Sequence, residues 1–96
     1  MLVRNKRNYI NCSNAADATD KIIINGDYVF YFGDFESASD WLNNFANSGN
    51  FHYEWLEREL DWETGDLKRN WVDIEIGNTE NGALRPFNIG RSEAVW

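Results

Sequence analysis

The chain is poor in the residues that build metal centres and disulfide frameworks. Its 96 residues include one cysteine, Cys12, and one histidine, His52. A zinc site needs three or four cysteine, histidine or carboxylate ligands in a defined spacing, and the sequence has too few cysteines and histidines for the usual sets. Because one cysteine cannot form an internal disulfide, the composition favours a protein of the cytoplasm. We therefore predict no metal, no cofactor and a cytoplasmic location.

Long apolar runs are also missing. No stretch approaches the roughly 20 residues that a transmembrane helix needs. The bases at Arg4, Lys6 and Arg7 are not followed by an apolar segment, so the N-terminus does not read as a signal peptide. The length suits one domain, and we expect residues 1–96 to form it.

Catalytic signatures are the third absence. No glycine-rich loop stands between a strand and a helix, which is the context a phosphate-binding loop requires. Carboxylates are abundant, but an acid–base pair needs one of them desolvated, and these lie on polar faces. No loop alternates acids with glycine as a calcium-binding EF-hand does. The sequence predicts a protein that is not an enzyme and has no catalytic residues.

Acidic and aromatic residues are plentiful instead. The chain has 16 acidic and 9 basic residues, a net charge of −7, and 16% of its residues are aromatic. Residues 27–66 hold ten acids and one base, Arg58, a local charge of −9. Phosphate binding needs clustered lysine and arginine, so this balance argues against nucleic acid as a direct partner. The acids either keep the surface soluble or meet a basic groove on another protein.

Residues 21–32 give the clearest β-strand pattern. Three isoleucines precede Asn25-Gly26, and five apolar or aromatic residues follow Asp27. Asn-Gly between two such runs is a strong β-hairpin signal. The second run is apolar on both faces, which is typical of a strand covered on both sides or of an aromatic face that binds a partner.

A helix is predicted over residues 38–47. Ser37 is a suitable N-cap, and Asp40 stands three residues later, as in a capping box. Gly49 is placed to end the helix in a left-handed conformation. The apolar residues then recur at helical spacing and should face the core. They are Ala38, Trp41, Leu42, Phe45 and Ala46.

A second helix is predicted to start near Asn50 or Phe51 and to stop at Gly65. Tyr53, Leu56 and Leu60 would share one face. Two sets of acids recur at helical spacing, the first at i, i+3, i+7 and the second at i, i+4, i+7, so they would line its exposed side. They are Glu54, Glu57 and Asp61, and Glu59, Glu63 and Asp66.

Three further strands complete the expected fold. Residues 7–12 suggest a strand, and residues 70–76 alternate between apolar and polar side chains. After a turn-rich link over 78–82, residues 83–89 should return at an edge, because Pro86 cannot donate to a ladder. We expect an α+β fold, with an antiparallel sheet of about four to five strands and two short helices packed on one face.

The sequence Phe32-Gly33-Asp34-Phe35-Glu36-Ser37, followed by a helix with Asp40, Trp41, Leu42 and Phe45, resembles a local pattern of small type I anti-CRISPR proteins. The likeness covers about 20 of the 96 residues and extends to the small, acidic profile of phage and mobile-element inhibitors. The resemblance implies binding to a Cas effector, with carboxylates where guide or target phosphates would lie. It carries over no functional residue.

Charge and resemblance together suggest a non-enzymatic inhibitor that binds a host protein through an acidic, nucleic-acid-mimicking surface. The alternative is an immunity protein or antitoxin that neutralises a nuclease toxin, and a third reading is a plain adaptor whose acids only aid solubility. The chain could be a monomer, or a homodimer joined through the aromatic hairpin. Trp55 and Trp62 are the candidate apolar anchors. The predicted partner-binding residues are Asp34, Glu36, Asp40, Glu54, Trp55, Glu57, Asp61, Trp62 and Asp66.

Overall fold

The β-hairpin predicted around Asn25-Gly26 is present in the computed structural model, which describes residues 7–80 and 83–88. Strands β2 (Asp20–Ile24) and β3 (Tyr28–Phe32) pair antiparallel. Asn25 and Gly26 have φ angles of 53° and 76°, the positive values that a tight hairpin turn of this kind requires. The backbone N–H of Asp27 donates to the carbonyl oxygen of Ile24, 3.1 Å away, and closes the turn.

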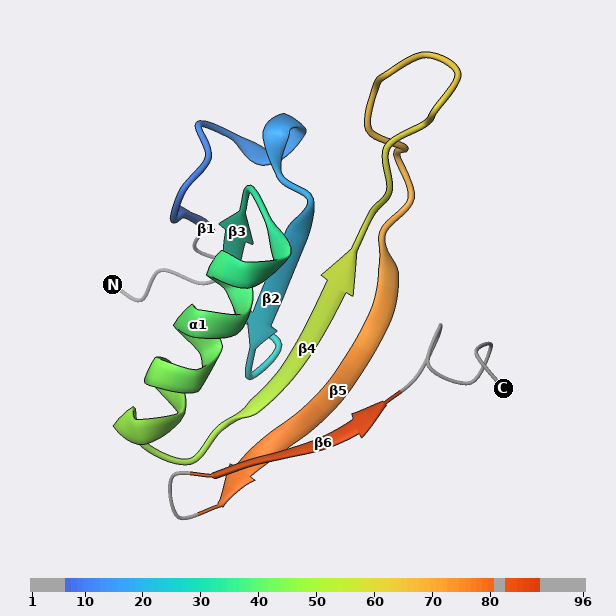
Figure 1. The fold of residues 1–96 in the computed structure, drawn as a ribbon. Coiled ribbons are helices and arrows are strands. Elements are labelled where there is room, and N and C mark those ends of the chain that lie inside the picture. The colour runs from blue at the N-terminus through green and yellow to red at the C-terminus, as the bar shows by residue number, and fades with distance from the viewer. Residues whose placement is uncertain (1–6, 81–82, 89–96) are drawn as a thin grey trace.

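The hairpin lies inside a six-stranded mixed sheet with the order β1-β3-β2-β4-β5-β6 (Figure 1). Only the β1–β3 pair is parallel. The remaining strands are β1 (Arg7–Tyr9), β4 (His52–Glu57), β5 (Val72–Glu80) and β6 (Ala83–Asn88). The α+β class is confirmed, and β6 with its proline is an edge strand as predicted. The sheet has more strands than the expected four to five and is not wholly antiparallel.

The predicted link over 78–82 begins too early, because residues 78–80 continue β5 and pair with β6. Residues 81, 82 and 89 lie outside the described part of the chain. The three-residue helical turn that follows β1 is η1 (Ala15–Asp17).

The first predicted helix exists but begins three residues earlier. Helix α1 (Phe35–Phe45) has Asp34 as its N-cap, and the Asp34 carboxylate accepts a hydrogen bond from the Ser37 backbone N–H at 2.8 Å. Asp34 has the extended backbone that an N-cap adopts, whereas Ser37 is already helical. The helix runs on into a 3-10 turn, η2 (Ala46–Ser48), and Gly49 ends it at φ 153° and ψ −174° rather than in the predicted left-handed conformation.

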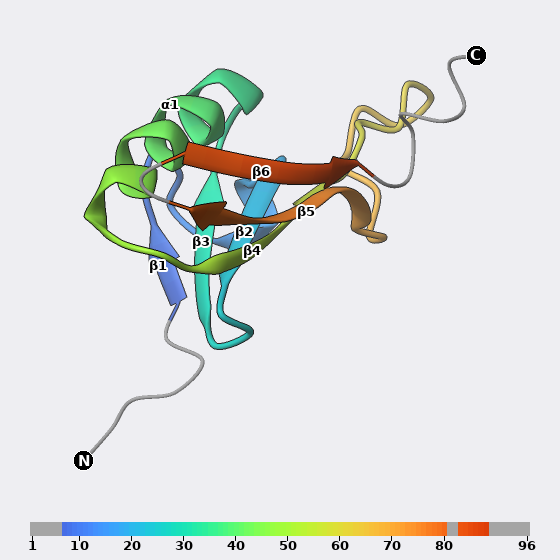
Figure 2. The same ribbon diagram turned by 90° about the horizontal axis from the view of Figure 1, so that it is seen from below.

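The apolar stripe of α1 packs on one face of the sheet, as predicted. Ala38, Leu42 and Ala46 are buried, and Trp41 and Phe45 are partly buried against the same core. The core's sheet side comes from alternate residues of β2, β3 and β4, since successive side chains of a strand point to opposite faces. Figure 2 shows β5 and β6 curving toward the side that carries α1. No helix in the described ranges is long and apolar enough to cross a membrane.

The second predicted helix is wrong. Its first half is β4, in which Tyr53 and Trp55 are buried while His52 is exposed, and Phe51 just before the strand is also buried. Aromatic residues at alternate positions suit a pleated strand, and β2 and β5 pair with β4 on both sides. These pairings are remote in sequence, so a window of local residues does not reveal them. The acids of residues 54–66 therefore do not share a helical face.

Residues 58–71 form a projecting hairpin between β4 and β5, called the arm below (Figure 1). The only bridge between its two limbs joins Leu60 to Leu67. The sequence prediction placed most of this segment inside the second helix.

Candidate partner-binding surface

Three of the predicted site residues lie on α1, with Asp34 and Glu36 at its beginning and Asp40 in its middle. Asp34, Glu36 and Asp40 are all exposed. Residues 34–57 contain no lysine or arginine, so no base from this segment neutralises them. Asp34 and Glu36, at the cap and in the first turn, also interact favourably with the helix dipole. This end of α1 is therefore a persistently negative surface.

Asp34 has a structural role as well as a surface position. Besides capping α1, it accepts a hydrogen bond from the Asn11 side chain, Nδ2 to Oδ2, at 3.1 Å. The same Asn11 amide accepts from the Gly33 N–H at 2.7 Å and so fastens the preceding loop to the helix start. Hydrogen bonds from Ser37, backbone first, lower the pKa of Asp34 below its ordinary value. The carboxylate is held in place and stays ionised.

Three more of the predicted residues, Asp61, Trp62 and Asp66, lie in the arm, whose backbone is held by hydrogen bonds between its two limbs. The Asp61 N–H donates to the Asp66 carbonyl oxygen at 2.7 Å, and the Lys68 N–H donates to the Glu59 carbonyl oxygen at 2.9 Å. The Gly65 N–H donates to the Asp61 carbonyl oxygen at 2.8 Å. Gly65 has a φ of 80°, which favours glycine at the turn.

Side chains lock the tip of the arm further. The Asp61 carboxylate accepts from the Glu63 N–H at 2.9 Å, and the Thr64 hydroxyl accepts from the Asp66 N–H at 3.2 Å. Such local hydrogen bonds to the backbone are typical of ordered turns. Glu63 and Asp66 are exposed, and Asp61 is half-buried.

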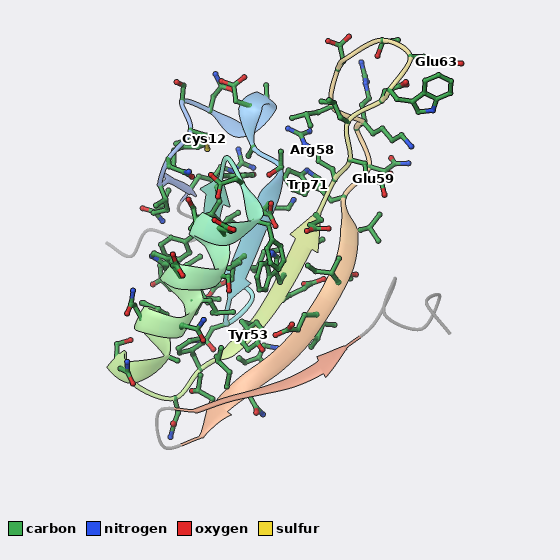
Figure 3. The ribbon with its side chains drawn as sticks, in the orientation of Figure 1. Cys12, Tyr53, Arg58, Glu59, Glu63 and Trp71 are labelled. Carbon is green, nitrogen blue, oxygen red and sulfur yellow. The ribbon has the colours of Figure 1, made fainter. Side chains whose placement is uncertain are left out.

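Arg58 clamps the base of the arm to the body. Its guanidinium donates from Nε to the Ala18 carbonyl oxygen at 2.8 Å and from Nη2 to the carbonyls of Ala15 and Ala16. The Trp71 ring lies 4.5 Å from the Arg58 Cζ and 4.6 Å from the Lys21 Nζ, distances measured to the ring centroid. Both cations are within the range of a cation–π contact. Figure 3 shows Arg58 and Trp71 at the root of the arm and Glu63 toward its far end.

The two predicted tryptophan anchors have opposite environments. Trp55 is 5% exposed, stacks on Phe35, and donates from Nε1 to the Asp20 carboxylate at 2.9 Å. Trp62, in the arm, is 86% exposed. Trp55 is thus a core residue, because β4 turns its ring toward α1, and only Trp62 presents an indole to solvent.

Glu54 and Glu57 also differ from the predicted arrangement. Glu54 lies on the face of the sheet opposite α1, since its neighbours Tyr53 and Trp55 point into the core. There it is next to Asp73 of β5, and a hydrogen bond with that carboxyl, burial and the Asp73 charge raise the pKa of Glu54 to about 7. Glu57 is half-buried at the end of β4, paired in the ladder with Asp20.

The sequence analysis did not predict that side chains of β5 lie next to those of β4. Tyr53 is fully buried and donates its hydroxyl to the Glu75 carboxylate at 2.6 Å, which together with burial raises the pKa of Tyr53. Oδ1 of Asp73 is buried and accepts no hydrogen bond within the described residues. Period-two alternation across residues 51–57 was the available signal for β4, and it would have brought β5 side chains next to these residues.

The beginning of α1 and the root of the arm lie at the same end of the molecule. The Arg58 N–H donates to the Thr19 carbonyl oxygen, and the Thr19 N–H donates to the Phe32 carbonyl oxygen, each at 3.0 Å. Phe32 is two residues before the N-cap of α1. Figures 1 and 2 together show the arm projecting from this end and leaning toward the side of the sheet that carries α1. The structure therefore places the start of α1 and the arm at the same end of the molecule. Glu54 lies on the opposite face of the sheet, and Trp55 is buried beside the start of α1, against Phe35.

No pocket and no group of acidic, histidine and cysteine side chains arranged to hold a metal ion occurs in the described ranges 7–80 and 83–88. What this surface offers chemically is exposed carboxylates and one exposed indole. Comparisons with family models, curated proteins and solved structures found no match to this chain.

Proposed function

We propose that this protein is a non-enzymatic inhibitor that binds a nucleic-acid-handling effector of the CRISPR–Cas kind through an acidic surface. The acids come from α1 (Asp34, Glu36 and Asp40) and from the arm (Asp61, Glu63 and Asp66). The observation that carries the proposal is their placement at one end of the molecule, five of the six being exposed.

A groove built for nucleic acid presents lysine and arginine at the spacing of phosphates. Carboxylates held on a folded surface can occupy those positions without the ordering cost of a flexible chain. Complementary charge also speeds the diffusional encounter of the two proteins and disfavours partners with acidic surfaces. The inhibitor would then act by competing with guide or target strands for the groove.

Bases within the arm only partly offset its acids. Lys68 forms an ion pair with Glu59, with 3.8 Å between Nζ and Oε1, and both side chains are well exposed. Exposed pairs of this kind contribute little, about 0–1 kcal/mol. Lys68 can therefore reorient when a basic partner approaches. The other bases of the arm are Arg69 and, at its root, Arg58, so the four acids of the arm leave it net negative.

Binding to purified type I Cas effector complexes, loaded with guide RNA, tests the proposal. The variant Glu36→Lys/Asp40→Lys/Glu63→Lys should reduce the association rate at least tenfold and flatten its dependence on salt. Asp27→Lys, in the turn of the β2–β3 hairpin, is the control for a single charge reversal outside this surface and is compared with Glu36→Lys alone.

Target-DNA binding by the effector should fall as the wild-type protein is added. If neither binding nor competition is seen with effectors of the type I systems, the Cas assignment fails. Tight binding to a nuclease toxin domain in the same assay would assign the protein to the immunity class instead.

A further inference from the structure

The arm exposes apolar side chains that the fold itself does not use. Trp62 is 86% exposed and Leu60 is 58% exposed. A single exposed apolar residue is ordinary, but an indole left almost wholly in water at the end of an ordered projection is not. Tryptophan is also the residue type most enriched among side chains that dominate binding energy in protein interfaces.

The arm is organised before any partner arrives. Its backbone bonds join Asp61 to Asp66 and Glu59 to Lys68, and Gly65 supplies the positive φ of the turn. Arg58 and the cation–π stack on Trp71 fasten the root to η1 and β2. A preformed projection loses little conformational entropy on binding, so more of the contact energy of its tip appears as affinity.

Charge next to the indole defines what it can meet. Trp62 stands between Asp61 and Glu63 in the sequence, and Asp66 closes the same turn, while Glu59 lies nearer the root and is ion-paired with Lys68. Anionic lipid and nucleic acid are both repelled by such a ring of carboxylates. A second copy would place the same acids against each other. An apolar pocket rimmed by lysine and arginine is complementary to both the indole and the acids.

We propose that the arm is the anchoring element of the interface, and that Trp62 enters an apolar pocket of the partner protein whose rim is basic. The inference rests on the proposed function for the partner's identity, but the chemistry of the pocket follows from the arm alone. In this arrangement the acids of α1 govern how fast the complex forms, while Trp62 governs how long it lasts.

Measuring the association and dissociation rates of the complex distinguishes the role of the α1 acids from that of Trp62. With the guide-loaded type I effector as probe, Trp62→Ala should raise the dissociation rate about thirtyfold or more and leave the association rate within about twofold. Trp62→Phe should recover part of the lifetime. Tyr28→Ala, which removes a 40% exposed aromatic ring in the β2–β3 hairpin, is the matched control and should change neither rate. An unchanged dissociation rate for Trp62→Ala in a complex that does form overturns the anchor.

A second experiment, a peptide selection, tests the chemistry of the pocket without assuming which effector is the partner. Random peptides displayed on phage are selected on the wild-type protein and counter-selected on correctly folded Trp62→Ala. Enrichment of peptides that combine lysine or arginine with apolar residues supports the inference, even if no effector binds and the proposed function fails. It is overturned if no peptide depends on Trp62, if the enriched peptides are acidic, or if sedimentation shows that Trp62 serves self-association.

Discussion

At the scale of single residues, Trp41 joins the helix to the sheet. Its ring centroid lies 4.4 Å from that of Phe30, 5.4 Å from that of Phe32 and 4.7 Å from that of Phe45. Aromatic pairs at these distances contribute beyond the area they bury. The ring is partly rather than fully buried, so its removal leaves a gap that solvent can reach.

We expect Trp41→Ala to lower the free energy of unfolding by about 2–4 kcal/mol, somewhat below the range for a fully buried tryptophan. Urea denaturation followed by circular dichroism measures the change. Trp62→Ala is the matched control, because the same truncation at an 86% exposed position removes no packing and should change stability by less than about 0.5 kcal/mol. Equal losses in the two variants would mean that Trp41 does not pack on the sheet as described.

Arg58 has a structural role that another positively charged side chain cannot fill. Its fork of donors reaches the carbonyl oxygens of Ala15, Ala16 and Ala18 at once. A lysine carries one ammonium and cannot span three carbonyls in this geometry. We expect Arg58→Lys to destabilise the fold by about 1–2 kcal/mol, and Arg58→Ala by somewhat more.

Hydrogen exchange at η1 and in the arm measures the effect of Arg58→Lys directly. Faster exchange at Ala18 and Lys68, with β2 and β4 unchanged, is the expected pattern. Arg69→Lys, an exposed arginine in the same arm, is the control. If Arg58→Lys leaves exchange at η1 unaltered, the guanidinium does not hold that segment to the arm.

At the scale of elements, adjacent strands β4 and β5 set two carboxyl groups side by side. Glu54 and Asp73 share the face of the sheet away from α1, with Lys21 of β2 nearby as the opposing charge. The hydrogen bond with Asp73 raises the pKa of Glu54 to about 7. A carboxyl whose pKa is raised in the folded state binds its proton more tightly there than in the unfolded chain. Its contribution to stability is complete below pH of about 4.5 and is lost as the pH rises through about 7.

Glu54→Gln should therefore become more stable relative to wild type as the pH rises from 5 to 8. The gain should be on the order of 1 kcal/mol, because partial exposure screens the carboxyl pair. Denaturation midpoints at the two pH values, for wild type and variant, measure it. Asp73→Asn should show the same trend, whereas Glu36→Gln in α1 should not. A difference that is constant with pH would mean that Asp73 does not raise the pKa of Glu54.

On the proposed function, the arm is an element that binding requires and folding does not. Within it, the backbone bridges are local, and Arg58 at its root is hydrogen-bonded to the body. Replacing residues 60–67 by Asn-Gly keeps Arg58 and Trp71 and closes the hairpin with a short turn. We expect the shortened protein to unfold at a temperature close to that of wild type and to lose most of its affinity for the partner. Affinity at the wild-type level would place the interface elsewhere, with the exposed face of β1 and β3 next in order.

At the scale of the whole molecule, charge is distributed unevenly around the fold. The α1 acids and the arm acids lie toward one end, where the bases Lys21 and Arg58, at the root of the arm, are engaged with Trp71. Exposed charges are screened over about 8–10 Å at ordinary ionic strength. Raising the salt should therefore slow association of the wild type strongly and the triple reversal Glu36→Lys/Asp40→Lys/Glu63→Lys weakly. Identical salt slopes for the two proteins would leave the acids as a solubilising surface only.

Local sequence predicted those parts of the fold whose signals are local. The Asn25-Gly26 turn, the apolar stripe of α1 and the edge position of the strand with Pro86 each depend on a few neighbouring residues. Even the start of α1 was misplaced by three residues, because Asp34 and Ser37 are both good caps. In the fold, Asn11, which is more than 20 residues away in sequence, donates to both side chains, and only Asp34 has the extended backbone of an N-cap.

What the sequence by itself determined is the charge, the aromatic content and the elements from β2 to α1. Only the tertiary structure decided that residues 52–57 form a strand, because their aromatic and acidic residues fit both a helical and an alternating pattern. Pairing with β2 and β5 resolved that ambiguity, burying Trp55 in the core and turning Glu54 to the opposite face. The same pairing extended residues 58–71 into an arm, and so left Trp62, of the two predicted anchors, exposed to solvent.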